Sequence, residues 1–558
     1  MGGHMRRRSL LLGGGGLAAG ALLSGGWLLP DPVRARLRDA VLRGTEESVG
    51  EPLRDLPVIR SENGVLDYDL HVAPARFTVG GRRLHVDAYN GMLPGAMLRF
   101  RPGDTVRLGL HNGMLPMGVP LNAAPPMCAT RPGENAGGPL ECLPGAVGHV
   151  KEGETLPQML LSTNLHTHGM QVSPEDPADN VFLRIEPGQS HNYEYQIPED
   201  HPAGLHWYHP HFHGATSHQG WMGLSGPIVV EGDIDEVPEV KAARERVIVI
   251  NEMWLNEDGE VPMAVVVPTA GKTPFSSIPA VPTRMLFPLN GQYQPDVSIR
   301  PGETQRWRVL NASPHRNMWL HVEEHPLYQI GQDGIPFGRT REVPSIMLSS
   351  ANRAEFIVKG GSPGRYTIYA EAYDQGHPGG DRPRVDLGTL VVEGEPANGR
   401  IPVDLVEPPR MPDLPVANRR ELTFSGDISG QDGMGVRFYI DDQLFDQDRI
   451  DQEVVAGTVE EWRLVNEDVF QHPIHIHVNP FQVIDVQGIP EGDTSWQTSP
   501  DIWWDTFRLP PEGEVTIRTF FRPDITGKTV FHCHILPHED NGMMGTLLIN
   551  PAEGAARR

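Results

Sequence analysis

The sequence predicts an all-β protein built from three consecutive β-sandwich domains. The chain has 558 residues, which is too long for one hydrophobic core. It contains 62 glycines and 53 prolines, residues that favour turns, and few long amphipathic runs. Two sets of short segments recur along the chain and mark a repeated unit of about the size of one sandwich domain.

The first recurring segment is a turn, an alternating strand and then an asparagine. Its three copies are RPGDTVRLGLHN from Arg101, RPGETQRWRVLNAS from Arg300 and AGTVEEWRLVNED from Ala456. The second recurring segment closes each unit, and its copies are GPIVVEG from Gly226, GTLVVEG from Gly388 and GTLLIN from Gly545. Six short matches in the same order are difficult to attribute to chance, so we interpret them as three copies of one β unit.

These repeats divide the chain into a leader and three domains. A boundary is expected near Asp235, and another in the proline-rich linker at residues 401–416. The expected parts are a leader and linker at 1–55 and domains at 56–235, 236–400 and 401–558.

The formal net charge is −25, which argues against nucleic acid or an anionic membrane surface as a partner. It favours cationic substrates only mildly, because a net charge cannot select one ligand.

The N-terminus predicts export. After MGGH, which looks like a cloning remnant, arginines at positions 6–8 precede Ser9 and an apolar, glycine-rich run at 10–29. This pattern resembles a twin-arginine signal and predicts use of the export machinery and a periplasmic or extracellular location. No clean A-x-A cleavage site appears, so retention of the leader as a membrane anchor stays open.

Two of the three cysteines, Cys128 and Cys142, lie in a segment rich in glycine and proline. Outside the cytoplasm such a pair predicts a disulfide. Two unpaired thiols are the alternative, because spacing in sequence does not determine the distance between sulfur atoms.

The third cysteine lies in the segment FHCHILPHEDNGMMG near the C-terminus. Cys533 stands between His532 and His534, with His538 five residues after the cysteine and Met543 ten after. Thiolate, imidazole and thioether ligands suit copper. On an extended strand the two flanking histidines face one way and the cysteine the other, so one segment could serve two metal sites. A buried free cysteine beside structural histidines is the alternative.

Three further segments contain histidines spaced two residues apart, which places two imidazoles on one face of a strand. The pairs are His166 and His168 in NLHTHGM, His209 and His211 in HWYHPHFHG, and His475 and His477 in QHPIHIHVNPF. His472 precedes the last pair across a proline and is free to point elsewhere. Imidazole suits copper, zinc, iron and nickel, although one isolated pair would more often be structural.

The remaining histidines near these segments are interpreted as structural or supporting residues: His206, His213 and His218. The second repeat unit has no cysteine, and its corresponding segment contains only His315 and His321. We therefore expect the second domain to have the same fold without a metal site of its own.

Together the four segments resemble the signature of the three-domain multicopper oxidases, the family of the laccases and bacterial cuprous oxidases. The family patterns HxHG, HxH after WY, HPxHxH and HCHxxxHxxxxM are matched in order by HTHG, HPH, HPIHIH and HCHILPHEDNGM, across roughly residues 60–550. The resemblance implies three cupredoxin-like Greek-key sandwiches and four copper ions, one of type 1, one of type 2 and two of type 3.

The resemblance also assigns ligands to each ion. Type 1 copper would be bound by His472, Cys533, His538 and, as a weak axial ligand, Met543. Type 2 copper would be bound by His166 and His475. The type 3 pair would be bound by His168, His209, His211, His477, His532 and His534. Since these ligands come from the first and third domains, the trinuclear cluster is expected at the interface of those domains.

The activity implied by the resemblance is the coupling of four one-electron oxidations of a donor to the reduction of O₂ to two waters. The expected donor is a phenol or an aromatic amine. Oxidation of Cu(I) for copper tolerance is the alternative, but the 19 methionines are scattered, with only a loose cluster at Met114, Met117 and Met127. A non-catalytic copper-binding scaffold is disfavoured because the full ligand set is present.

Two carboxylates are expected to move protons for water formation. Glu539 follows His538, where bacterial members of the family have a relay glutamate, and Asp179 in PADNVF resembles the acid near type 2 copper. The alternative for both is an ordinary surface or helix-capping carboxylate.

Overall fold

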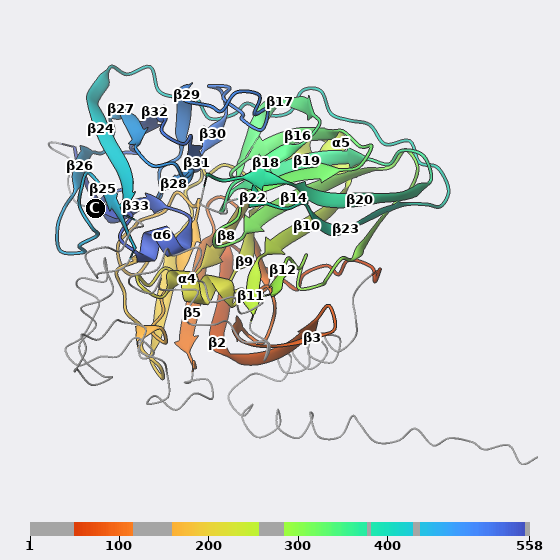
Figure 1. The fold of residues 1–558 in the computed structure, drawn as a ribbon, viewed down its shortest axis with the longest axis horizontal. Coiled ribbons are helices and arrows are strands. Elements are labelled where there is room, and N and C mark those ends of the chain that lie inside the picture. The colour runs from red at the N-terminus through yellow and green to blue at the C-terminus, as the bar shows by residue number, and fades with distance from the viewer. Residues whose placement is uncertain (1–49, 115–158, 256–283, 377–380, 428–435, 553–558) are drawn as a thin grey trace, which may run out of the picture. The chain divides into compact units, whose positions relative to one another are not determined.

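The computed structural model describes residues 50–114, 159–255, 284–376, 381–427 and 436–552, which fold mainly as β-strands (Figure 1). The leader, Cys128, Cys142, Met117 and Met127 lie outside the described residues. In the part of the chain that is described, no helix is both long and apolar enough to cross a membrane.

The first sandwich combines a four-stranded and a five-stranded sheet around one core. The four-stranded sheet has the order β3-β2-β5-β7, with bounds Arg82–Tyr89, Val65–Val79, Thr105–Asn112 and Ser190–Gln196. The five-stranded sheet has the order β1-β4-β9-β8-β6, with bounds Val58–Arg60, Met97–Phe100, Gly226–Val230, Gly204–His209 and His166–His168. Leu66 and Val106 of the first sheet pack with Leu98 and Ile228 of the second, which closes the core.

The second sandwich has two five-stranded sheets. One has the order β10-β14-β19-β16-β17, with bounds Arg244–Asn251, Thr304–Ala312, Arg353–Lys359, Leu327–Gln332 and Ile335–Val343. The other has the order β13-β23-β20-β15-β18, with bounds Asp296–Ile299, Val385–Val392, Gly364–Glu371, Met318–Val322 and Ile346–Leu348. Two short ladders accompany them, β11 with β12 (Met253–Leu255, Arg284–Leu286) and β21 with β22 (Tyr373–Asp374, Asp381–Arg382).

The third sandwich combines a six-stranded and a five-stranded sheet. The larger has the order β25-β24-β27-β32-β29-β30, with bounds Arg437–Ile440, Val416–Asp427, Val459–Asn466, Glu514–Phe520, Phe481–Gln487 and Trp503–Trp504. The smaller has the order β26-β34-β33-β28-β31, with bounds Gln452–Val455, Met544–Asn550, Gly527–Cys533, His472–Ile476 and Thr506–Leu509.

The three sandwiches share one topology, and the recurring sequence segments occupy equivalent strands in it. The first segment forms β5, β14 and β27, each parallel to the strand β2, β10 or β24. The closing segment forms β9, β23 and β34, each parallel to β4, β13 or β26 in the opposite sheet. The predicted all-β fold of three consecutive sandwiches is confirmed.

The asparagine that ends the first segment has the same role in all three copies. Asn112, Asn311 and Asn466 are buried, and each donates its side-chain amide to two backbone carbonyls at 2.6–2.9 Å. Each also accepts the N–H of the residue two positions on, at 3.0–3.1 Å. A buried loop needs partners for its backbone polar groups, and this side chain supplies three of them.

Residues at the end of the expected leader and linker pack against the second sandwich. Leu53 is buried in the core of that sandwich, and its N–H donates to the carbonyl of Asp296 at 2.8 Å. The chain then enters β1 of the first sandwich at Val58.

In the described ranges, short helices interrupt the strands at α4 (Thr216–Trp221), η1 (Asp233–Glu236), α5 (Pro238–Ala242) and α6 (Leu536–Asp540). Helix α4 of the first sandwich lies beside α6 of the third (Figure 1). Asp540 of α6 accepts hydrogen bonds from the backbone N–H of Gly214 and Ser217 at 2.6 and 2.7 Å, and from the Ser217 hydroxyl at 2.6 Å. This buried carboxylate joins the two sandwiches next to the histidine segment at 209–211.

Candidate metal centre

One buried thiol and two imidazoles lie together in the third sandwich. Cys533 Sγ is 3.5 Å from His472 Nδ1 and 3.7 Å from His538 Nδ1, and these two nitrogens are 3.1 Å apart. Strands β28 and β33 pair so that Ile474 is opposite Cys533. His472, two residues before Ile474, therefore points to the side of the sheet on which the cysteine lies.

Burial raises the pKa of the Cys533 thiol, because a thiolate without a counter-charge is unfavourable in a protein interior. A bound cation would reverse this effect, since a coordinating thiol loses its proton. Two imidazole nitrogens and one sulfur at these separations form the His₂Cys donor set of trigonal copper sites. The residues present therefore fit a copper ion.

Backbone hydrogen bonds hold Met543 beside this group. The N–H of Cys533 donates to the carbonyl of Met543 at 3.1 Å, and the N–H of Met543 donates to the carbonyl of His538 at 3.0 Å. The Met543 side chain is fully buried. The Phe438 ring stacks on His538 with centroids 3.9 Å apart, and the N–H of Ile535 points to Cys533 Sγ at 3.4 Å.

The other eight predicted histidine ligands gather between the first and third sandwiches in three overlapping groups. Within each group the ligand atoms lie within 4.8 Å of one another. The groups are His166, His168 and His475; His168, His209 and His534; and His211, His477 and His532. The structure thus divides the six residues expected at the type 3 pair into two sets of three, a division that the spacing in sequence had not indicated.

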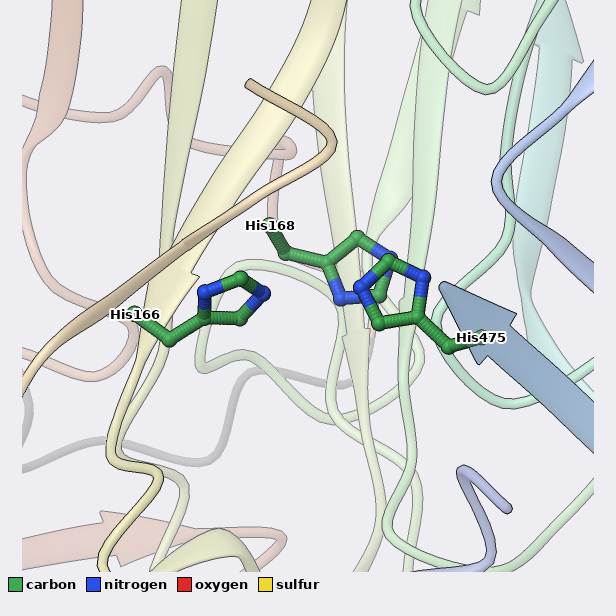
Figure 2. Close-up of side chains that lie close together, drawn as sticks. All are labelled: His166, His168 and His475. Atoms are coloured by element: carbon green, nitrogen blue, oxygen red, sulfur yellow. The ribbon is translucent and has the colours of Figure 1, made fainter. Parts of the chain in front are cut away.

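Figure 2 shows the first of these groups. His166 and His168 come from β6, and His475 comes from β28 of the third sandwich. The rings of His168 and His475 are stacked, with centroids 3.8 Å apart, and the ring of His166 stands to one side. Nε2 of His166 and Nε2 of His475 are buried and have no hydrogen-bond partner.

The third group, His211, His477 and His532, is also arranged to bind a positive ion. Nε2 of His211 is 3.1 Å from Nε2 of His532 and 3.1 Å from Nε2 of His477, and the last two are 3.2 Å apart. A neutral imidazole carries one proton on its two ring nitrogens. Where Nε2 is the unprotonated nitrogen, its lone pair faces the neighbouring Nε2 atoms in this buried space. A metal ion bound by all three nitrogens would remove this repulsion.

Hydrogen bonds outside the cluster fix the tautomers of several of these histidines. Nδ1 of His475 donates to the carbonyl of Asp505 at 2.7 Å, and Nδ1 of His209 to the carbonyl of Pro210 at 2.9 Å. Nδ1 of His166 lies 2.8 Å from the carboxylate of Asp179. Because these Nδ1 atoms hold the protons, Nε2 keeps its lone pair for a metal, the arrangement usual for ligating histidines.

Burial lowers the pKa of every one of these eight histidines, and neighbouring imidazoles lower several of them further. A neutral imidazole is the form that binds a metal. Burial therefore keeps each of these rings in the neutral form that can bind a metal.

Glu539 lies at the edge of the histidine cluster. Its carboxylate is 3.2 Å from Nδ1 of His532 and 3.8 Å from Nδ1 of His211, and it is fully buried. Burial raises the pKa of Glu539 to about 7. A carboxyl group with such a pKa can both give and accept a proton near neutral pH.

Asp179 contacts Nδ1 of His166, the ring nitrogen that is not the unpartnered Nε2. Besides His166, it accepts the N–H of Thr167 at 2.7 Å and the Thr167 hydroxyl at 2.9 Å. Burial raises the pKa of Asp179 to about 7, while the bonds from Thr167 act in the opposite direction. The geometry gives it contacts that orient His166.

A third carboxylate near the cluster, Asp505, was not identified from the sequence. Its Oδ1 lies 3.1 Å from Nε2 of His168, and it forms two hydrogen bonds with Arg353 at 2.9 and 2.5 Å. Arg353 also donates to the carbonyl of Leu205 at 3.0 Å. One buried guanidinium of the second sandwich thus links the first and third sandwiches beside His168, and no local sequence signal marks this contact.

Arg353→Met is expected to destabilise the protein by about 3–5 kcal/mol, because it leaves the buried Asp505 without its cationic partner. The matched control is Arg365→Met, which removes an exposed pair with Asp296 and should cost about 0–1 kcal/mol. Denaturant unfolding of both variants measures the difference. Equal stability of the two variants would contradict the importance of this link.

The histidines interpreted as structural have other contacts and lie outside the four groups above. His213 packs edge-on against Phe445, and His206 packs against His201. His218 is buried within α4. In the second sandwich His321 stacks on Tyr369, and His315 lies 3.2 Å from the guanidinium of Arg382.

Known proteins share both the sequence and the fold. Family models for multicopper oxidases match residues 157–234, 244–394 and 409–553. A laccase of Bacillus stratosphericus is 27% identical over 493 residues, 82% of this chain and 89% of the laccase. A multicopper oxidase of Staphylococcus aureus is 24% identical over 412 residues, 70% of this chain and 77% of the relative. A solved structure of a multicopper oxidase from Campylobacter jejuni, described as a metallo-oxidase, superimposes on this chain with a TM-score of 0.70 at 22% identity. The match covers 91% of this chain and 97% of the Campylobacter chain, and it supports the fold.

The chain folds as three cupredoxin-like sandwiches, with a cysteine–histidine group in the third and a histidine cluster between the first and third. This combination defines a multidomain copper protein. The three matching models extend over most of the chain. The chain belongs to the multicopper oxidase family. It is a copper-dependent oxidase, which uses O₂ and a reducing substrate.

Proposed function

We propose that this oxidase couples four one-electron oxidations of a small donor, a phenol or an aromatic amine, to the reduction of one O₂ to two waters. In this proposal type 1 copper is held by His472, Cys533, His538 and Met543, and type 2 copper by His166 and His475. One type 3 copper is held by His168, His209 and His534, and the other by His211, His477 and His532.

The observation that carries the proposal is the position of Cys533. Its sulfur belongs to the thiolate group, while its peptide neighbours His532 and His534 belong to two different histidine groups. A continuous covalent path through the cysteine side chain and the neighbouring peptide bonds therefore joins the site that would take electrons from the donor to the site that would pass them to O₂. Bound copper ions would supply the redox chemistry, taking electrons singly and delivering four to O₂.

The remaining residues would hold the ligands and supply protons. Asp179 and the carbonyl of Asp505 keep the protons of His166 and His475 on Nδ1. Glu539 contacts the histidine cluster directly and is the carboxyl group best placed to deliver protons for water formation. Asp179 would then act by positioning His166, and Glu539 by proton transfer.

The donor is expected to approach His472. Nε2 of His472, on the side of the ring away from Cys533, lies 3.4 Å from the carboxylate of Asp468. His472 itself is buried, while the Asp468 side chain beside it is 11% exposed and the adjacent Val469 is 47% exposed. An electron could thus enter from a donor that never reaches the buried sulfur.

The alternative is oxidation of a reduced metal ion such as Cu(I). The carboxylate of Asp468 beside His472 favours a cation at this entrance. The structural relative from Campylobacter jejuni is described as a metallo-oxidase. The relative from Bacillus stratosphericus is named a laccase. The scattered methionines favour the organic donor, since Cu(I) prefers soft sulfur ligands.

The proposal is tested by steady-state kinetics on the copper-loaded protein, with O₂ consumption recorded for a phenol, an aromatic amine and Cu(I). We expect the organic donors to have the higher kcat/KM, four donor molecules to be oxidised per O₂, and no peroxide to accumulate. A kcat/KM for Cu(I) that is higher by orders of magnitude would establish the metallo-oxidase alternative instead.

We also propose that the twin-arginine-type leader exports the folded, copper-loaded protein to the periplasm or the exterior, and that it acts as a membrane anchor if it is retained. The arginines at positions 6–8 and the following apolar run support this proposal. Cell fractionation with N-terminal sequencing of the mature protein distinguishes a released from an anchored form.

A further inference from the structure

A separate group of metal-binding side chains lies on the β3-β2-β5-β7 sheet of the first sandwich. Asp69, His71 and His111 each offer one ligand atom, and these atoms all lie within 4.8 Å of one another. Asp69 is exposed and the two histidines are partly exposed. The group shares no residue with the four buried groups between and within the first and third sandwiches.

The pairing of two strands brings these residues together. Strands β2 and β5 are parallel, with His71 opposite His111 and Asp69 opposite Gly109. Residues 69 and 71 point to the same face because they are two apart, while Leu70 points into the core. The two imidazole rings are stacked, with centroids 4.4 Å apart and planes 12° apart.

Gly109 leaves the space that the Asp69 carboxylate occupies. A Cβ atom at position 109 would overlap Oδ1 of Asp69 and would lie 3.2 Å from Nε2 of His111. Without a side chain there, the carboxylate reaches across to His111, with Oδ1 at 3.3 Å from Nε2. The three donors therefore converge because this position is a glycine.

A fourth side chain orients one of the imidazoles. Nδ1 of His111 lies 2.8 Å from the hydroxyl of Ser190, which pairs with His111 across β5 and β7. Ligating histidines usually have such an outer partner on the ring nitrogen that does not bind the metal. Burial and the neighbouring His111 lower the pKa of His71, which favours the neutral, metal-binding ring.

We propose that Asp69, His71 and His111 form a surface binding site for a divalent transition-metal ion, with Cu²⁺ as the preferred ion. Two imidazoles and one carboxylate suit Cu²⁺, Ni²⁺ and Zn²⁺, and Cu²⁺ is the most tightly held of these in the Irving–Williams order. Since the site is partly exposed, its ion exchanges with solution, unlike ions in the buried groups. The proposal is independent of the donor and of the electron path proposed above.

The test uses the full chain, loaded with copper and then treated briefly with EDTA to remove exchangeable ions. Equilibrium dialysis against Cu²⁺ should show one additional ion per chain, with an electron paramagnetic resonance signal that contains nitrogen coupling. His71→Ala and His111→Ala should abolish this additional ion. Ser190→Ala should weaken its binding by about 10–100-fold, the effect typical of losing an outer partner. Zn²⁺ should compete for the site with lower affinity.

Gly109→Ala is the most discriminating variant, because it keeps all three ligands but displaces Asp69, and it should also weaken Cu²⁺ binding. His85→Ala, a partly exposed histidine on β3, is the matched control and should bind the additional ion as wild type does. An unchanged blue absorption band shows that each variant is folded. The proposal would be overturned if the wild type bound no additional ion. It would also be overturned if all variants kept the additional ion at full affinity, because the ion would then be bound elsewhere, such as at His4 of the leader.

Discussion

Cys533→Ser is expected to abolish both the blue colour and the oxidase activity, which should fall to the background rate. The intense colour of such sites comes from a copper–thiolate bond, and Cys533 Sγ lies 3.5 Å from His472 Nδ1 and 3.7 Å from His538 Nδ1. The same substitution removes the sulfur from the covalent path to His532 and His534. Absorption spectra, copper analysis and O₂ consumption measure the three effects, and the expected copper content is three ions per chain in place of four.

Two comparisons separate loss of the thiolate from a general loss of structure. Met543→Leu keeps the cysteine and both imidazoles, so it should remain blue and active, with a shifted potential. The Cys533→Ser protein should retain the copper signals of the histidine cluster, because none of those ligands changes. A blue, active Cys533→Ser protein would contradict the assignment of the thiolate site.

Glu539→Gln is expected to lower kcat by roughly 10²-fold, the lower end of the range for loss of a general acid or base. Glutamine has nearly the same shape and can occupy the same buried position beside Nδ1 of His532, but it cannot carry a proton to the cluster. The blue band and the copper content should therefore stay unchanged. Stopped-flow measurements should show normal reduction of the blue site by donor without O₂, and slow reoxidation when O₂ is added.

The conservative variant Glu539→Asp provides the control. It keeps a titratable carboxyl group in the same pocket, so its kcat should lie between those of wild type and Glu539→Gln. A purely structural role for Glu539 would instead make the two variants equally impaired, or would change the blue band in both. An unchanged turnover in Glu539→Gln would remove this residue from the mechanism.

The sequence alone was sufficient to predict the repeated unit and to select the side chains expected at the metal centres. Alternation along a strand is a local property, so the spacing in HTHG, HPH and HPIHIH predicted pairs of imidazoles on one strand face. His166 and His168 do lie on β6, whereas His211 and His477 lie just beyond the ends of β8 and β28. The recurring Asn112, Asn311 and Asn466 marked equivalent positions because each closes the same loop with the same hydrogen bonds. The family pattern then named twelve expected metal ligands, and the structure brings eleven of these residues into four groups, with Met543 held beside one of them.

Only the tertiary structure decided how those residues are grouped and which others support them. The division of the six histidines expected at the type 3 pair into two triples depends on how β28 pairs with β33 and on how the third sandwich meets the first. The contact of Asp505 with His168 joins residues 337 positions apart, and the site at Asp69, His71 and His111 depends on the pairing of β2 with β5. Contacts between distant strands are set by packing of whole sheets, for which a short segment carries no signal.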